Sequence, residues 1–159
     1  MISQPVTKLL VTQISHELNA HQMYMGMSLY FGRQSLKGWA KRFHDQAVEE
    51  AGHGSKIIAF LIDNDIEFPL PAVRGAPTTY ASAREAVEAA LANEVNVTGL
   101  INVLAAAARD SADHRSLEFL QWFIAEQVEE ERSMKALLDL IDSGINLFQA
   151  EAHLESLSG

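Results

Sequence analysis

The sequence predicts an all-α fold: a bundle of four long helices, with a long crossover between the second and third helices and a short fifth helix at the C-terminus. Apolar residues recur at spacings of three, four and seven along four stretches of about 26 to 30 residues each. Glycine, proline and small polar residues separate these stretches, and three of the four prolines fall between the second and the third. Strand-like alternation of apolar and polar residues is not apparent.

The first two helices are predicted to form an antiparallel hairpin. The first is expected from Pro5, which suits a first helical turn, to about Arg33, where a short turn follows. The second runs from about Gly38 to Asn64. The proline-rich segment 65–77 is expected to be extended, because a residue that precedes proline avoids the helical conformation.

The second half of the chain predicts another hairpin. Ser82 and Glu85 form a capping box that opens a third helix, which extends to about Arg109. After a turn at 110–113, a fourth helix runs to about Asp142.

We expect residues 1–159 to form one domain, with the bundle over about 5–142 and the short C-terminal helix over about 146–157. The crossover can carry the chain along the whole bundle, so that the helices run up, down, down and up.

Composition excludes several classes of protein. Lys and Arg total 12 against 21 Asp and Glu, and a net charge of −9 argues against a nucleic-acid partner. There is no cysteine, which removes disulfides and thiolate metal sites and fits a reducing compartment. Neither a secretory signal nor an apolar run near the ~20 residues of a membrane span is visible. We therefore expect a cytoplasmic protein without a membrane partner.

Polar residues interrupt the apolar stripe of every helix. On the first helix, Glu17 lies at heptad spacing between Leu10 and Tyr24. The other stripes carry Glu50, His53, Glu94, Gln127 and Glu130. One such carboxylate alone usually indicates a side chain that reaches solvent, because Asp and Glu are almost never fully buried unless paired. The same interruption on four helices favours a shared site.

These polar residues also share one depth in the predicted bundle. Each lies about 15 to 19 residues from the nearest hairpin turn, which at ~1.5 Å per residue places them all within roughly one helical turn. Buried ionised carboxylates need balancing cations, and four of them match two divalent ions. Carboxylates with few imidazoles suit iron or manganese, and Glu50-x-x-His53 is a di-iron signature element.

A second acidic cluster adjoins these residues and consists of Glu49, Glu126, Glu129 and Glu130. Like charges at spacings of three and four crowd one side of a helix and destabilise it slightly. The cluster is either a solvated acidic face or a further, weaker cation site.

Over essentially its whole length the chain resembles the non-haem bacterial ferritins. The matching residues are Glu17, Tyr24, the Glu49–His53 segment, Glu94, the Glu126–Glu130 segment and Asn146-Leu147-Phe148. The resemblance implies a ferritin-like fold and a ferroxidase that oxidises Fe²⁺ with O₂ or H₂O₂. It also implies a homo-oligomeric shell of 24 subunits that stores Fe³⁺ as a mineral.

The resemblance further assigns ligands. One iron is held by Glu17, Glu50 and His53. The second is held by Glu50, Glu94 and Glu130, with Glu50 bridging and Gln127 nearby. A third iron is expected at Glu49, Glu126, Glu129 and Glu130. Tyr24 is expected to be a redox-active aromatic beside the metals, and Trp122 is either another or a packing residue.

Haem is not expected. Haem-containing bacterioferritins repeat Glu-x-x-His in their second half, where this chain has Gln127-x-x-Glu130. Their haem-binding methionine directly follows the first-half glutamate, where this chain has Ala51.

Several points stay open at the level of sequence. Gly52 and Gly54 flank His53 and either allow close helix packing or loosen that ligand. Candidates for an iron channel near the second hairpin turn are Asp110, Asp113 and His114. Two rival functions are a di-iron oxidase or peroxidase that stores no iron, and a metal-free helical interaction protein.

Overall fold

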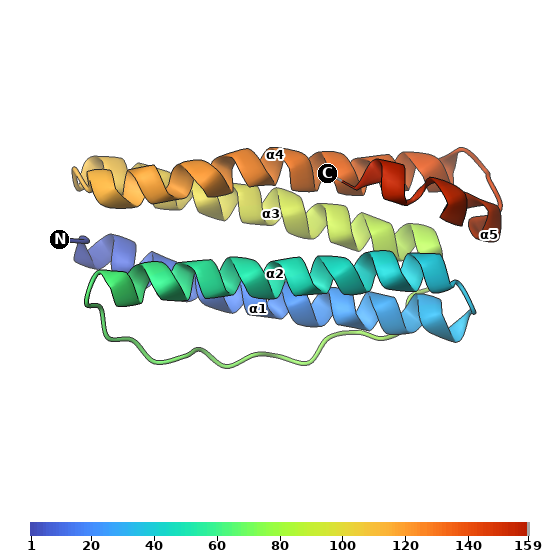
Figure 1. Ribbon diagram of the computed structural model, residues 1–159, viewed down its shortest axis with the longest axis horizontal. Coiled ribbons are helices and arrows are strands. Elements are labelled where there is room, and N and C mark those ends of the chain that lie inside the picture. Colours follow the sequence, from blue (N-terminus) through green and yellow to red (C-terminus); the bar gives the residue numbers. More distant parts are fainter. Residues whose placement is uncertain (159) are drawn as a thin grey trace.

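The computed structural model, which describes residues 1–158, confirms the all-α bundle (Figure 1). The four long helices are α1 (Gln4–Arg33), α2 (Lys37–Asp63), α3 (Ala83–Asp110) and α4 (His114–Asp142). No strand occurs among residues 1–158. In Figure 1, α1 lies beside α2 and α3 beside α4, and the crossover runs back along the α1–α2 hairpin to the start of α3.

Local capping explains where three of these helices begin. Ser3 caps α1 by accepting a hydrogen bond from the Val6 amide, and Ser82 caps α3 by accepting from the Glu85 amide at 3.1 Å. Asp113 does the same for α4 through the Ser116 amide at 3.0 Å. These side chains satisfy backbone donors that have no partner inside the helix.

The first turn of α2 is capped instead by the C-terminal tail. Leu36 precedes α2 and offers no capping side chain, whereas Glu151 Oε1 accepts from the Gly38 amide at 2.8 Å. The indole of Trp39 also donates to the Leu147 carbonyl at 2.9 Å. These contacts fasten the tail to the bundle, and Figure 1 shows it folding back from the end of α4.

The short C-terminal helix is present in a more broken form than the sequence predicts. It consists of one α-helical stretch, α5 (Leu147–Ala150), followed by two 3₁₀ turns, η1 (Glu151–His153) and η2 (Glu155–Leu157). The carboxylate of Glu151 and the carbonyls of Leu147 and Leu157 bind to α2 and α4. Contacts with the bundle therefore help to hold the tail in place.

Two apolar clusters fill the bundle, one toward each end. One is rich in aromatic rings, with Phe31 and Phe43 stacked at 5.4 Å between ring centroids. The other is mainly aliphatic and includes Ile14, Ile57 and Ile101. The polar stripe residues lie between these clusters, so close packing on both sides fixes the positions of their helices.

By length and hydropathy, α3 is the one helix among residues 1–158 that could pass for a membrane span, although the sequence contains no long unbroken apolar run. Of the residues in its most apolar 18-residue window, 33% are buried in this chain. Core helices of bundles satisfy the same criterion, and the buried stripe of α3 carries Glu94.

Candidate metal centre

The four long helices bring the predicted ligands into one buried layer. All six side chains are at most 6% exposed: Glu17, Glu50, His53, Glu94, Gln127 and Glu130. Within this layer, ligand atoms of three residues lie within 4.8 Å of one another in overlapping groups. Such a concentration of acid is costly inside a protein unless cations or protons balance it.

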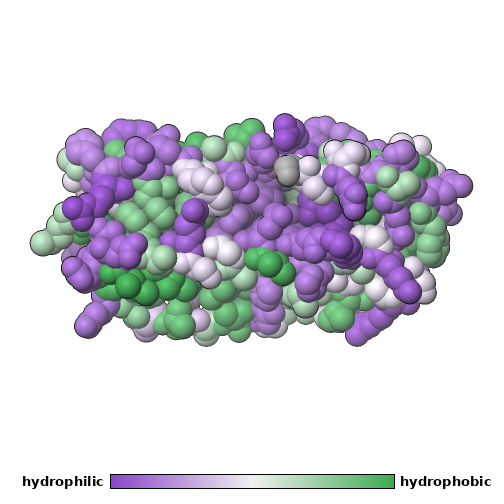
Figure 2. Space-filling view, viewed as in Figure 1, coloured by the Kyte–Doolittle hydropathy of each residue, from purple (hydrophilic) through white to green (hydrophobic). Residues whose placement is uncertain are grey.

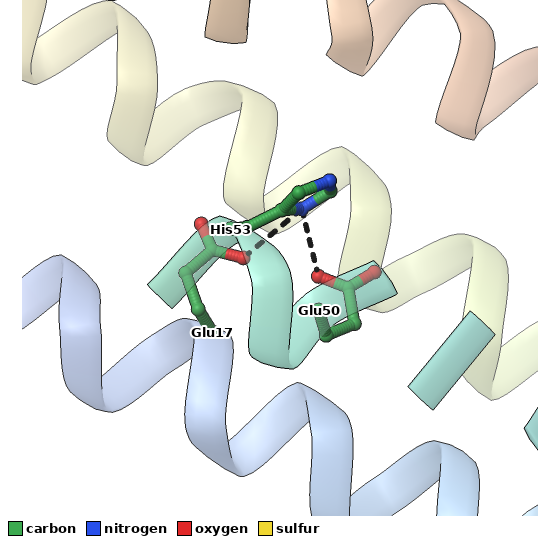
Figure 3. A group of neighbouring side chains, drawn as sticks. All are labelled: Glu17, Glu50 and His53. Atoms are coloured by element: carbon green, nitrogen blue, oxygen red, sulfur yellow. Dashed lines mark ion pairs between the residues drawn. The ribbon is translucent and has the colours of Figure 1, made fainter. Parts of the chain in front are cut away.

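The first group joins α1 to α2 and contains Glu17, Glu50 and His53. Its three side chains converge on a common point (Figure 3). His53 Nδ1 lies 3.2 Å from Glu50 Oε2 and 3.6 Å from Glu17 Oε2. Two carboxylates and one imidazole nitrogen thus face one another, which is a suitable donor set for Fe²⁺.

The second group joins α2, α3 and α4 and contains Glu50, Glu94 and Glu130. Glu50 belongs to both groups, so a single carboxylate lies between two positions where a cation fits. Carboxylates that project into the core from several helices are found in di-iron bundles.

Neutral side chains fix the orientation of Glu94. Tyr24 donates its hydroxyl hydrogen to Glu94 Oε1, and Gln127 Nε2 lies 3.3 Å from Glu94 Oε2. The tyrosine is fully buried and the glutamine is 3% exposed. Both predicted companions of the ligands therefore contact a ligand directly.

Two carboxylate oxygens in this layer are buried without a hydrogen-bond partner. They are Glu17 Oε2 in the first group and Glu130 Oε1 in the second. Unpaired buried acceptors cost roughly 1–3 kcal/mol, more when charged, so native proteins rarely keep them without reason. A divalent cation bound in each group would give the unpaired oxygen of that group a partner.

Several ionisable groups in this layer have pKa values far from their ordinary ones. Burial, with the negative charge of Glu94 beside it, raises the pKa of Glu130 to about 8. Burial also raises the pKa of Glu50 and of Glu94. Burial alone would lower the pKa of His53, but the carboxylates of Glu17 and Glu50 beside its Nδ1 outweigh burial and raise that pKa to about 11. Without metal, protons take the place of cations in this layer.

The acidic cluster lies beside the centre and opens to the surface. Glu49, Glu126, Glu129 and Glu130 line a depression of about 250 Å³ between α2 and α4. Figure 2 shows hydrophilic side chains gathered over the middle of the face that α2 and α4 form. Glu126 and Glu130 also form a third group with His53, and Glu126 Oε1 lies 4.0 Å from His53 Nε2. The cluster therefore adjoins both the centre and solvent.

Comparison with known proteins identifies the family. Residues 7–143 match the family model described as a ferritin-like domain.

The chain belongs to the ferritin family.

Several ferritins are similar to this chain in sequence, and one of known structure shares its fold. The ferritin BfrB of Mycolicibacterium smegmatis is 38% identical over 144 residues, which is 90% of this chain and 80% of that protein. The bacterial non-heme ferritin of Staphylococcus aureus is 35% identical over 82% of this chain and 79% of its own. The open pore ferritin of Archaeoglobus fulgidus superposes with a TM-score of 0.93 at 31% identity and covers 99% of this chain and 98% of its own. Ferritins store iron, and this ferritin has carboxylate groups arranged so that they could bind metal.

Trp122 is neither a core residue nor remote from the centre of this ferritin. Its indole is 40% exposed and meets the His53 ring edge-on, with centroids 5.4 Å apart. Lys56 Nζ also lies over the indole ring, 4.5 Å from its centroid. A redox role for this tryptophan stays a prediction.

The two glycines around His53 have different surroundings. A Cβ on Gly54 would lie 3.4 Å from Leu18 Cδ2 of α1, whereas a Cβ on Gly52 would meet nothing within 4 Å. An added Cβ would make ordinary van der Waals contact with α1 at Gly54 and would meet open space at Gly52, so nothing in the structure explains either glycine.

One of the predicted channel residues has a structural role. Asp113 is 5% exposed and accepts hydrogen bonds from the Ser3 and Ser116 amides at 2.9 Å and 3.0 Å. Its carboxylate therefore links the N-terminus to the start of α4, and a role for it in a channel stays a prediction. Asp110 and His114 are exposed, and their role in a channel stays a prediction.

Sequence reasoning missed the polar residues that support the ligands. Gln13 donates to Glu17 at 2.8 Å, and Gln46 donates to Glu50 at 2.9 Å. Each glutamine lies four residues before the glutamate that it contacts, so helical spacing alone could have found both. Arg42 lies at the same spacing before Gln46, to which it donates, but sequence alone gives no reason to expect this arginine to be buried.

Proposed function

We propose that this ferritin is a ferroxidase, and that it oxidises Fe²⁺ with O₂ or H₂O₂ at a di-iron centre and stores the Fe³⁺ as a mineral. The observation that carries the proposal is the pair of overlapping groups that share Glu50, each with one buried carboxylate oxygen that lacks a hydrogen-bond partner. A solvated acidic face would show neither burial nor unpaired oxygens.

The first Fe²⁺ would bind to Glu17, Glu50 and His53, and the second to Glu50, Glu94 and Glu130. His53 must lose a proton to bind a metal, so binding at neutral pH releases protons. Glu50 keeps the two ions adjacent, which lets one O₂ molecule take electrons from both. Tyr24 and Gln127 hold Glu94 in place while the charge of the ions changes.

The acidic depression supports a third, weaker iron site at Glu49, Glu126, Glu129 and Glu130. Two of these glutamates, Glu49 and Glu129, are exposed, and water competes for a cation there. A site of this kind suits iron in transit between the centre and the mineral.

The remaining parts of the proposal rest on family membership and on the motifs, net charge and composition of the sequence. We propose a homo-oligomeric shell of 24 subunits in the cytoplasm, without haem, nucleic-acid or membrane partners. We also propose that residues 1–159 act as one domain.

The test is an anaerobic titration with Fe²⁺ followed by O₂. The proposal predicts a break at two tightly bound Fe²⁺ per subunit and rapid oxidation once O₂ is admitted. Long-term loading should then reach far more than three iron ions per subunit. A titration curve without a break would favour a metal-free interaction protein. Oxidation of Fe²⁺ without accumulation of iron would favour an oxidase that stores no iron.

A further inference from the structure

Gln46 of α2 is enclosed beside the centre and contacts two carboxylates from different helices. It is 1% exposed. Its Nε2 lies 2.9 Å from Glu50 Oε1 and 2.7 Å from Glu130 Oε2. An amide nitrogen carries two hydrogens, so it can donate one to each carboxylate. A single side chain thus links the shared ligand on α2 to a ligand on α4.

Arg42 determines which end of the amide faces the carboxylates. Its Nη1 donates to Gln46 Oε1 at 2.9 Å. A guanidinium group only donates hydrogen bonds, so the amide oxygen must face Arg42 and the amide nitrogen must face the ligands. Arg42 is itself 8% exposed, which leaves its side chain little freedom to move away.

The C-terminal tail holds Arg42 in turn. Arg42 Nη2 donates to Ser133 Oγ at 2.7 Å, and Ser133 Oγ donates to the Leu157 carbonyl at 3.1 Å. Ser133 is 5% exposed. A continuous chain of hydrogen bonds therefore runs from the tail, through Ser133, Arg42 and Gln46, to the two ligands.

The consequence for the centre is that one oxygen of each ligand is occupied and the other is left for a cation. Glu50 uses Oε1 for Gln46 and turns Oε2 toward His53 Nδ1 at 3.2 Å. Glu130 uses Oε2 for Gln46, and its Oε1 is the buried oxygen without a partner.

We propose that Gln46, oriented by Arg42, is a positioning residue that makes Glu50 and Glu130 each present one defined oxygen to the metal ions. The inference rests on the proposed di-iron function. Without the amide, both carboxylates can rotate and bind a cation through either oxygen or both. The geometry and affinity of the two sites then change, although no ligand has been removed.

The test uses Co²⁺ bound to the whole protein, measured by calorimetry and by the visible absorption of the bound ion. Gln46→Met keeps the length of the side chain and removes the amide. Loss of an outer hydrogen-bond partner of a metal ligand typically costs 10–100-fold in affinity, and we expect a loss in this range together with a changed Co²⁺ spectrum. Arg42→Met should give a smaller change in the same direction, because the amide remains. Gln121→Met, at an exposed position of α4, is the matched control and should leave both readouts unchanged.

Two further comparisons separate positioning from a general loss of structure. Ser133→Ala should shift the Co²⁺ spectrum, whereas Ser133→Thr, which keeps the hydroxyl, should restore it. If Gln46→Met folds poorly because Arg42 is left unpaired, the double variant Arg42→Met/Gln46→Met removes both buried partners together and should still weaken Co²⁺ binding.

Glu50→Ala tests the centre itself in the same assay. If Glu50→Ala loses Co²⁺ while the Gln46 variants keep the wild-type affinity and spectrum, Gln46 does not position the ligands and the proposal is wrong, although the centre stands. If Glu50→Ala also binds Co²⁺ like the wild type, the di-iron assignment fails and the role of Gln46 fails with it.

Discussion

At the scale of single residues, Glu50 is the most important residue of the centre, because it belongs to both ligand groups. Its burial raises the pKa of its carboxyl group, which means that the folded apo protein holds this group at a cost when it is ionised. Function and stability therefore make opposite demands on the same side chain.

Glu50→Ala should abolish rapid Fe²⁺ oxidation and leave a folded apo protein whose stability is unchanged or higher. It removes the shared ligand, so the loss of rate should exceed the roughly 10–100-fold typical of an outer-shell change. It also relieves crowding among buried carboxylates. Stopped-flow absorbance and thermal melting of the apo protein measure the two effects. Glu118→Ala, which removes an exposed charge from α4, is the control. Oxidation by Glu50→Ala at the wild-type rate would remove Glu50 from the centre.

Glu49→Ala and Glu129→Ala should spare the first oxidation and alter the later turnovers. Both residues line the acidic depression and neither belongs to the two ligand groups of the centre. The initial rate should stay within about twofold of wild type, whereas repeated turnover and the ratio of Fe²⁺ to O₂ consumed should change. Oxygen-electrode measurements over successive additions of Fe²⁺ give both quantities. Wild-type behaviour in both would mean that the depression is merely a solvated acidic face.

The ligands could be predicted from sequence because two regularities coincide at each of them. Helical spacing puts Glu17, Glu94 and Glu130 on buried stripes, and equal distance from a turn puts them at one depth. Contacts between distant segments offer no such regularity. The link from Leu157 through Ser133 to Arg42 depends on how the tail folds back, and periodicity carries no information about that.

At the scale of elements, the crossover packs very closely against α1 at one glycine. Gly26 is buried, and a Cβ there would lie 2.1 Å from the Pro77 carbonyl oxygen. That oxygen is part of the backbone, so the crossover and not a flexible side chain would have to move. The proline-rich composition predicts an extended crossover but gives no reason to expect contact at Gly26.

Gly26→Ala should therefore destabilise the protein, although alanine is the better helix former. Overpacking of a closed site typically costs 1–3 kcal/mol, and at a backbone contact this close we expect the upper part of that range, which exceeds the gain of about 1 kcal/mol in helix propensity. Gly99→Ala is the matched control, because it lies in α3 with nothing within 4 Å of the added Cβ and should be neutral or stabilising. Chemical denaturation of both variants under one set of conditions makes the comparison. Equal stability of the two variants would show that the crossover can shift at Pro77 with little cost in free energy.

At the scale of the whole molecule, the polar layer divides the bundle core into two apolar clusters. Packing at the two ends must hold the four helices together against repulsion in the middle. Stability of the apo protein is therefore tied to the protonation of this layer, and metal binding is tied to stability.

The free energy of unfolding of the apo protein should fall as pH rises through neutrality, and divalent metal should restore it. The folded-state pKa of Glu130 is raised from 4.5 to about 8, so its contribution to stability is complete below 4.5 and is lost as pH rises to 8. The pKa of His53 is raised from 6.5 to about 11, so its contribution is complete below 6.5 and is lost over that range. Between pH 6.5 and about 8 the stabilising contributions of both groups therefore decrease together as pH rises.

The measurement is the thermal melting of the apo protein between about pH 5 and pH 8 at one fixed scan rate, with and without Zn²⁺ or Co²⁺. These ions replace Fe²⁺ without oxidation, and at one hundred times its dissociation constant each bound ion should add ~2.7 kcal/mol. The ions displace protons from the layer and are themselves held less tightly as pH falls, so their benefit should be largest at the alkaline end. In the double variant Glu50→Ala/Glu130→Ala, both the fall in stability with rising pH and the stabilisation by metal should be smaller. If neither ion changes the melt of the wild-type protein at any pH, the buried layer binds no metal and the ferroxidase assignment fails.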